Sequence, residues 1–339
     1  MSEKTDVKDQ EEATSSQEQE SQAQEPAGSL FFRKIEKDTW EAWTWTAVGL
    51  LATAAVVWIV AFLKLGYISV LCWGVGIPLT AFMAVPIILW GLVKTMLNPP
   101  IFRPSRSIGF VSVLLVSYMA NYPQFRAPVS TEGWQSDHTY SLPFEGAWYT
   151  IAGGDSLDTN YMGTAPAMRF GYVFTVLTED GKRFDGDPLE LKNYPCYGAP
   201  VVAPVDGEVV SVKTGFKDNV PGKSSTENML GNYIVLRVDK QEDLILTSLK
   251  NDSITVKEGD KIKRGQKVGE CGNSGSATNP ELRLYLVKDS KQLVITEGLP
   301  LEFSNYEVVG DDRIVQGVPT GSGNPEDLKS GQTVRAFTP

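Results

Sequence analysis

Two long runs without a charged side chain constrain this chain most strongly. The first run is Ala47–Leu63 and the second is Val70–Val93, and Lys64 is the only charge between them. A helix rises 1.5 Å per residue, so about 20 apolar residues cross a hydrocarbon core of about 30 Å. The pattern therefore predicts a membrane-crossing helical hairpin, with spans over about residues 46–64 and 69–94.

A third apolar run, Ile108–Ala120, is only 13 residues long. Its helical length of about 20 Å is less than a full span. Two structures are compatible with this run and its uncharged flanks. One is a short third span over about residues 107–121, and the other is a segment that enters the membrane without crossing it.

Basic side chains indicate the orientation of the chain in the membrane. They gather in two clusters: Arg33, Lys34 and Lys37 before the first run, and Lys94, Arg103 and Arg106 before the third. The positive-inside rule places both clusters, with the N-terminus, on the cytoplasmic side of the cell (inner) membrane. Three spans, which we favour, place residues 122–339 in the periplasm or outside the cell; two spans would leave them cytoplasmic.

Three flanking segments have compositions of their own. Residues 1–28 are rich in Glu, Gln and Ser and predict a disordered acidic tail. Residues 29–45 combine aromatic and basic side chains, which is typical of an interfacial helix. Residues 311–339 are rich in glycine and proline and predict a C-terminal extension.

Residues 122–310 predict a β domain. Short β-prone segments alternate with turns such as Asp206-Gly207 and Glu258-Gly259-Asp260, and no long helical period interrupts them. The fold class is therefore N-terminal transmembrane α-helices followed by an all-β barrel or sandwich. Residues 122–339 carry 22 basic and 30 acidic side chains. This acidic balance argues against nucleic-acid binding, which depends on lysine and arginine.

Five sequence blocks, in order, carry a resemblance to a known family. They are LPFEGAWYTIAGGD (142–155), EDGKRFDG (179–186), GAPVVAPVDGEVV (198–210), GNYIVLRV (231–238) and ITVKEGDKIKRGQKVGECGNSGSATNPELRLYL (254–286). Residues 140–310 thus resemble the M23 (LytM, lysostaphin-like) zinc metallopeptidases. The resemblance implies a duplicated hybrid motif barrel or sandwich. Biotinyl and lipoyl carriers share a similar barrel but need a lysine at the hairpin tip, where this chain has Asp206-Gly207.

The resemblance also implies where zinc would be bound. Family members hold the ion with a His-x-x-x-Asp pair and the second histidine of a His-x-His pair, and further histidines assist catalysis. The matching positions here are Arg169 and Val173 (or an earlier stretch, Asn160–Met162), Ser248 for a catalytic histidine, and Glu281 and Arg283 for His-x-His. None of these is an imidazole, and an arginine offers no lone pair to a metal. We therefore expect no catalytic residue, no metal and no cofactor.

Three alternatives remain for these positions. Glu281 and Arg283 share one face of a strand, so they pair with each other or with Arg169 and fill the former cavity. Alternatively, Arg169 and Arg283 grip a carboxylate ligand bidentately, or the domain is a hydrolase with unrecognised residues. We expect four side chains to line the cleft: Tyr172, Asn232, Asn273 and Tyr285.

Cysteine and histidine are scarce. Cys72 lies in a membrane run, whereas Cys196 and Cys271 lie in the β domain. An extracytoplasmic location would favour a disulfide between the latter two, and two buried thiols are the alternative. His138, the only histidine, is expected to be an ordinary surface residue.

These observations lead to three hypotheses. The first is a membrane-anchored, catalytically inactive M23-like domain that binds a partner protein or cell-wall peptide as a scaffold or regulator. The second is an accessory subunit of a multi-subunit membrane complex. The third is a peptidoglycan endopeptidase with a non-standard site.

Overall fold

The computed structural model describes residues 38–121, 124–292, 295–311 and 314–336. The expected acidic tail and residues 29–37 of the expected interfacial helix lie outside this part of the chain. The described chain divides into two compact units. One unit holds residues 38–55 and 79–120, and the other holds residues 56–78 and 121–336.

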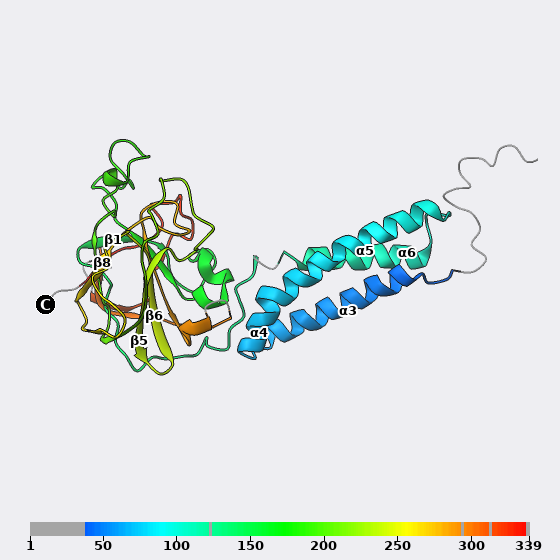
Figure 1. Ribbon diagram of the computed structural model, residues 1–339, viewed down its shortest axis with the longest axis horizontal. Coiled ribbons are helices and arrows are strands. Elements are labelled where there is room, and N and C mark those ends of the chain that lie inside the picture. Colours follow the sequence, from blue (N-terminus) through cyan, green and yellow to red (C-terminus); the bar gives the residue numbers. More distant parts are fainter. Residues whose placement is uncertain (1–37, 122–123, 293–294, 312–313, 337–339) are drawn as a thin grey trace, which may run out of the picture. The chain divides into compact units, whose positions relative to one another are not determined.

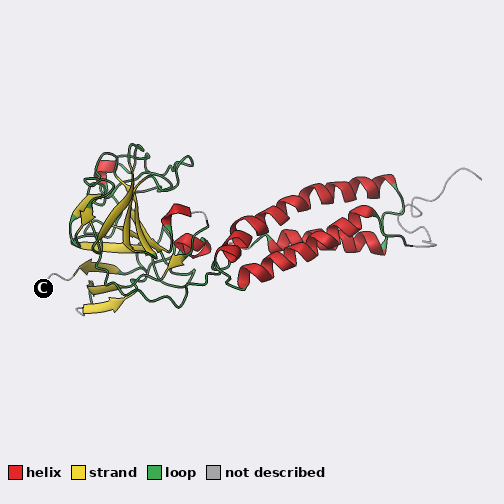
Figure 2. Ribbon diagram, turned by 60° about the horizontal axis from the view of Figure 1, so that its bottom comes forward, coloured by secondary structure: helices red, strands yellow, loops and turns green. Residues whose placement is uncertain are grey.

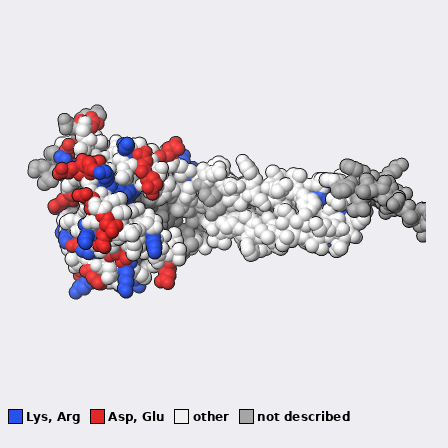
Figure 3. All heavy atoms as spheres, turned by 90° about the horizontal axis from the view of Figure 1, so that it is seen from above, with Lys and Arg blue, Asp and Glu red and all other residues white. Residues whose placement is uncertain are grey.

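The helices follow the apolar runs (Figure 1). They are α3 (Ala42–Phe62), α4 (Tyr67–Leu71), the π-helical turn η1 (Cys72–Gly76), α5 (Ile77–Leu97) and α6 (Pro104–Met119). Both α3 and the continuous helical segment Tyr67–Leu97 are long and apolar enough to cross a membrane. The prediction of two apolar N-terminal helices is confirmed. In Figure 3 this region is almost free of charged side chains, whereas the β domain carries both signs.

The third run forms a longer helix than its 13 apolar residues suggested. Pro104 begins α6, which favours helix initiation because proline lacks the N–H that would be unsatisfied there. The side chain and backbone of Ser105 both donate to the Asp38 carboxylate, at 2.8 and 2.9 Å. The 16 residues of α6 extend about 24 Å.

Trp43 organises the first unit. It is 1% exposed, and its indole lies against Gly91 and Gly109, where an added Cβ would come within 2.7 Å of the ring. We expected this residue in an interfacial helix over 29–45, but residues 38–41 form no helix and α3 begins at Ala42. The indole is buried in the bundle because two glycines leave room for it.

A buried charge network fixes one end of the bundle. Arg106 is 1% exposed, and its Nε and Nη2 donate to Glu41 Oε1 at 3.1 and 2.5 Å. Its Nη1 donates to the carbonyls of Asn98 and Pro100 at 2.7 and 2.9 Å. A buried guanidinium is tolerated only when it is paired in this way. The network ties the start of α3 to the start of α6.

In the second unit, the hairpin tip packs against the chain that follows α6. Ala61, Trp73 and Ile77 form a buried cluster with Ala127. The indole Nε1 of Trp73 donates to the carbonyl of Thr164 at 3.0 Å. Lys64 forms an ion pair with Glu132, and Ala127 N donates to Gly163 O at 2.8 Å. Residues 56–78 are therefore fastened directly to the β domain.

The β domain is built on one large antiparallel sheet (Figure 2), which confirms the predicted all-β class. Its strand order is β12-β11-β13-β1-β2-β9-β6-β5-β4-β7, with β10 on β9, and β3 and β8 form a separate pair. The strands are β1 (Ala147–Ala152), β2 (Tyr172–Thr175), β3 (Pro200–Val202), β4 (Gly207–Lys213), β5 (Asn232–Asp239), β6 (Glu242–Leu249), β7 (Lys261–Ile262), β8 (Lys267–Glu270), β9 (Leu282–Val287), β10 (Gly298–Leu299), β11 (Phe303–Val308), β12 (Ile314–Gly317) and β13 (Thr333–Ala336).

The central strands bury both faces. Because side chains alternate along a strand, Leu236, Leu246 and Leu284 enter the main core on one face. Val173, Ile245 and Tyr285 form a smaller cluster on the other face. This second face carries two of the expected metal positions, Val173 and Arg283.

The C-terminal segment belongs to the sheet. We expected an extension over residues 311–339, but β12 pairs with β11, and β13 pairs with both β1 and β11. Val334 in β13 is fully buried. The domain boundary expected at residue 310 is therefore not seen.

Cys196 and Cys271 are joined by a disulfide, with their Cα atoms 5.8 Å apart. Both cysteines are fully buried in the main core. The bond links the turn before β3 to the segment after β8, so it closes a long loop of the domain.

Candidate functional site

Three neighbouring strands bring two of the expected metal positions, Val173 and Arg283, into one row. In the antiparallel register, Arg283 of β9 lies opposite Val173 of β2 on one side and opposite Thr247 of β6 on the other. Directly opposed side chains of antiparallel strands share a face. We call Val173, Arg283 and Thr247 the central row. Glu281 immediately precedes β9, and Ser248 follows Thr247.

An ion pair occupies the central row. Arg283 Nε donates to Glu281 Oε1 at 2.6 Å, and the side chains are 17% and 5% exposed. Arg283 Nη1 also donates to Ser276 Oγ at 2.7 Å. The guanidinium is thereby held by its strand neighbour and by the loop before β9. Of the alternatives raised by the sequence, the structure has the pairing of Glu281 with Arg283.

Tyrosines surround this ion pair. Burial raises the pKa of Tyr161, and the charge of Glu281 raises it further. Burial lowers the pKa of Arg283, but the charge of Glu281, the hydrogen bond to it and the two nearby tyrosines together outweigh burial, so the net shift of this pKa is upward. Burial also raises the pKa of Tyr285. Near neutral pH, Arg283 in the central row therefore carries a positive charge, and the neighbouring Tyr161 and Tyr285 are neutral.

Arg169 interacts with a different carboxylate. Its Nη1 lies 2.7 Å from Asp155 Oδ1, and its Cζ lies 4.8 Å from the ring centroid of Phe170. The side chain is 1% exposed. Arg169 and Arg283 thus engage separate acids, an arrangement that does not favour a shared grip on one ligand.

The other expected site residues have structural surroundings. Ser248 is buried with a left-handed φ of 62°, and its Oγ has no hydrogen-bond partner among the described residues. Asn232 Nδ2 donates to the carbonyls of Phe216 and Leu249, at 2.8 and 3.0 Å. Asn273 Nδ2 donates to Asn219 O at 3.0 Å.

Of the two expected cleft tyrosines, only Tyr285 lies on the face of the central row, in the cluster with Val173. Tyr172 precedes Val173 in β2, so its side chain points to the opposite face. There it packs in the main core and donates to Leu301 O at 2.5 Å. It also lines a cavity of about 630 Å³ with Glu132, Asp155 and Glu302.

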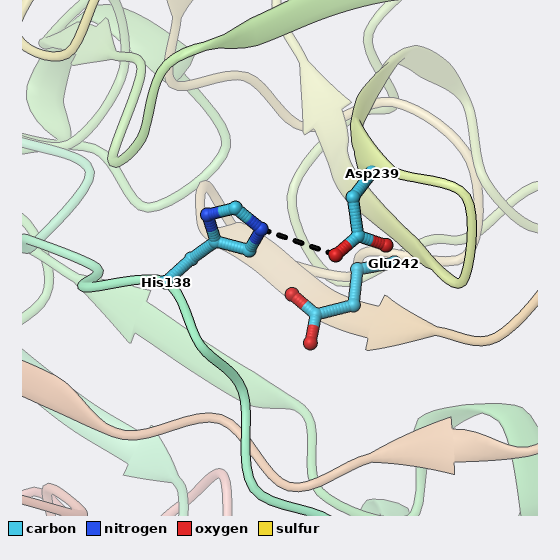
Figure 4. Close-up of side chains that lie close together, drawn as sticks. All are labelled: His138, Asp239 and Glu242. Carbon is cyan, nitrogen blue, oxygen red and sulfur yellow. Dashed lines mark hydrogen bonds and ion pairs between the residues drawn. The ribbon is translucent and has the colours of Figure 1, made fainter.

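A second cluster was not foreseen (Figure 4). His138 Nε2 lies 3.1 Å from Asp239 Oδ2, and ligand atoms of His138, Asp239 and Glu242 all lie within 4.8 Å of one another. Asp239 ends β5 and Glu242 begins β6, so the short turn between them was the one sequence signal for the two acids. His138 lies about 100 residues earlier, where no local pattern connects it to them.

Helices and sheet together define the class: two apolar helices followed by an antiparallel β domain of the M23 type. The model of Peptidase family M23 matches residues 193–294. The recognition of an M23-like domain is confirmed. No curated protein matches the chain.

Several solved structures are similar over about half of the chain. A zinc-containing peptidase from Vibrio cholerae is 21% identical, with a TM-score of 0.30 over 48% of this chain and 41% of that one. The SpoIIQ–SpoIIIAH pore-forming complex is 15% identical, with a TM-score of 0.30 over 48% of this chain and 89% of that one. The catalytic domain of lysostaphin from Staphylococcus simulans is 20% identical, with a TM-score of 0.25 over 49% of this chain and 89% of that one. The chain spans about two fifths of the Vibrio cholerae peptidase.

The groups in the central row do not fit the zinc that the family implies. Zinc of this type needs about three nitrogen, oxygen or sulfur ligands near 2 Å. Val173 offers no donor, Arg283 is a cation, and the Glu281 carboxylate is already engaged by that cation. The only imidazole cannot reach the row, because Glu242 beside it is five residues along β6 from Thr247, about 16 Å away.

Proposed function

We propose that this protein is a membrane-anchored, non-catalytic M23-like protein that binds a partner protein of the cell envelope as a scaffold or regulator. The observation that carries the proposal is the Arg283–Glu281 ion pair in the central row. A cation fixed there by 2.6 Å and 2.7 Å hydrogen bonds occupies the place of a metal ligand. Without the metal, the row has no means of producing hydroxide near neutral pH.

The loop between β4 and β5 supports a protein partner rather than a cell-wall peptide. Phe216, Val220 and Met229 are exposed on it, and Met229 is 64% exposed. The loop is nevertheless held in place, because Asn219 Nδ2 donates to the carbonyls of Gly275 and Ala277 at 2.8 and 3.0 Å. Three apolar side chains exposed on one ordered loop are the basis for favouring a protein partner.

We expect the full-length protein to release no peptides from purified peptidoglycan, because no residue of the central row activates water. Mass spectrometry of the soluble fraction would measure this, with zinc added, with cobalt added and with a chelator present. An active M23 peptidase in the same buffer provides the control. Peptide release that the chelator abolishes would refute the proposal and support the endopeptidase hypothesis.

Packing within each unit supports three membrane crossings. At one end of the first unit, Asp38 accepts hydrogen bonds from Ser105, so α6 begins where the chain enters α3. In the second unit, Ala127 packs with Ala61 at the end of α3. The chain therefore returns along the hairpin between residues 104 and 127. This supports a β domain on the side of the hairpin tip, which the positive-inside rule assigns to the outside of the cytoplasm.

Labelling with a membrane-impermeant maleimide tests this topology. In a Cys72→Ser background, we expect Lys217→Cys in the β domain to react in intact spheroplasts. We expect Met96→Cys, at the other end of α5, to react only after permeabilisation; both positions are exposed. Cys196 and Cys271 do not react with the maleimide because they are joined by a disulfide. The reversed pattern would place the β domain in the cytoplasm.

A second candidate, an accessory subunit of a membrane complex, is favoured by the helical region. One apolar helix is enough for anchoring, yet three helices pack around Trp43 and share the Arg106–Glu41 network. The π-helical turn η1 adds a further irregularity, and such turns are frequent at functional sites. This role is compatible with partner binding by the β domain.

A further inference from the structure

The cluster of His138, Asp239 and Glu242 has the chemistry of a cation site. It gathers an imidazole nitrogen and two carboxylates from the segment before β1 and from the β5–β6 turn. Ligand atoms around zinc lie about 3–4 Å apart when the metal–ligand bonds are near 2 Å. The 3.1 Å separation of His138 Nε2 and Asp239 Oδ2 already matches that geometry, and the ligand atoms of all three residues lie within 4.8 Å of one another.

Glu242 is a buried carboxylate without a basic partner. It is 1% exposed and accepts hydrogen bonds from Trp134 Nε1 at 2.9 Å, Ser136 Oγ at 2.7 Å and Tyr140 OH at 2.7 Å. No lysine or arginine forms an ion pair with it among the described residues. Buried carboxylates are normally paired with a cation or bound to a metal. The three donors leave about one of four acceptor positions free and fix the carboxylate's direction.

Asp239 provides a second carboxylate beside that of Glu242. The backbone N–H of Gln241 donates to Asp239 at 2.7 Å and is the main cause of the lowered pKa of Asp239. Burial and the hydrogen bond to Glu242 raise the pKa of Tyr140, which therefore stays a neutral donor. Among the described residues, no lysine or arginine forms an ion pair with either carboxylate, and the only ion-pair partner of Asp239 is His138.

An adjoining cavity gives room for water. It measures about 280 Å³, and its lining includes Ser136, His138, Tyr140, Glu302 and Ser304. Three protein ligands plus water complete a tetrahedral sphere for zinc. The cavity also offers an entry path, which any metal site requires.

We propose that His138 Nε2, Asp239 and Glu242 bind a divalent transition-metal cation of the Zn²⁺ class. One imidazole and two carboxylates suit Zn²⁺ or Mn²⁺, whereas Ca²⁺ prefers six or more oxygen ligands. The ion clamps the segment containing Trp134, Ser136 and His138 onto the β5–β6 hairpin. This site lies about 16 Å along β6 from the central row, so it does not rest on the proposed function and does not restore the family's catalytic centre.

Calorimetric titration of the chelator-treated full-length protein with ZnCl₂ tests the site, with MnCl₂ as a second probe. We expect one Zn²⁺ per chain and a higher melting temperature when zinc is present. His138→Ala and Asp239→Asn should each weaken zinc binding at least tenfold. Asp137→Asn removes a neighbouring exposed carboxylate outside the cluster and should change the affinity by less than threefold. Melting curves without metal confirm that each variant is folded.

The possible results separate this inference from the proposed function. No zinc binding by the unaltered protein overturns the site. Zinc bound equally well by His138→Ala and Asp239→Asn also overturns it, and an ion held elsewhere would then count against the non-catalytic proposal. Loss of zinc binding in the His138→Ala variant supports the site and does not affect the non-catalytic proposal.

Discussion

Cys196→Ala combined with Cys271→Ala should lower the unfolding free energy of the β domain by about 4 kcal/mol. The bond joins residues 75 positions apart, and the loop-entropy relation gives about 4.5 kcal/mol for a loop of that length. Alanine is chosen because both positions are fully buried in the main core, where a serine hydroxyl would need a partner. Guanidinium unfolding of the full chain in detergent, followed by tryptophan fluorescence, measures the difference.

Cys72→Ala is the matched control for this experiment. Cys72 is the free cysteine and lies in η1 outside the β domain. Its replacement should leave the β-domain transition within about 0.5 kcal/mol of the original, as is usual away from such structural features. A double alanine variant that unfolds at the same denaturant concentration as the unaltered protein would show that the bond does not stabilise the fold.

Glu281→Ala should destabilise the β domain by about 3–5 kcal/mol. The change removes the carboxylate that faces Arg283 Nε and leaves a guanidinium that is only 17% exposed without its countercharge. Breaking a buried ion pair at one partner has about this effect, since the other charge stays buried. The same unfolding measurement applies.

The double variant Glu281→Leu with Arg283→Leu provides the control for this effect. Removing both charges leaves no uncompensated group, and such replacements are often neutral or stabilising. The double variant should therefore recover most of the stability lost in Glu281→Ala. A loss below about 1 kcal/mol in Glu281→Ala would mean that water solvates Arg283 and that the central row is open.

The sequence predicted the helices and the β class for physical reasons. A run of some 20 uncharged residues has few alternatives to a helix in lipid, because all backbone groups must be satisfied internally. The short strands β12 and β13 were missed, since their segment is rich in glycine and proline. One of the two partners of β13 is β1, which lies more than 150 residues away. Strand pairing over such distances leaves no local trace.

The contacts within the candidate sites could likewise be predicted only where the partners are close in sequence. The two-residue alternation of a strand was enough to expect Glu281 beside Arg283, because both residues belong to one short segment. The partner of Arg169 could not be foreseen, since Asp155 reaches it from a loop after β1. His138 meets Asp239 only through the tertiary fold, so composition suggested a solitary surface histidine.

The hydrogen bond from Trp73 to Thr164 has a consequence for recognition. Thr164 ends the 3-10 helix η3 (Tyr161–Thr164), whose first residue lies beside Arg283 and Glu281. The hairpin tip and the Arg283–Glu281 ion pair are thus connected through a single turn of 3-10 helix. A binding protein that contacts both would meet them at a spacing set by η3.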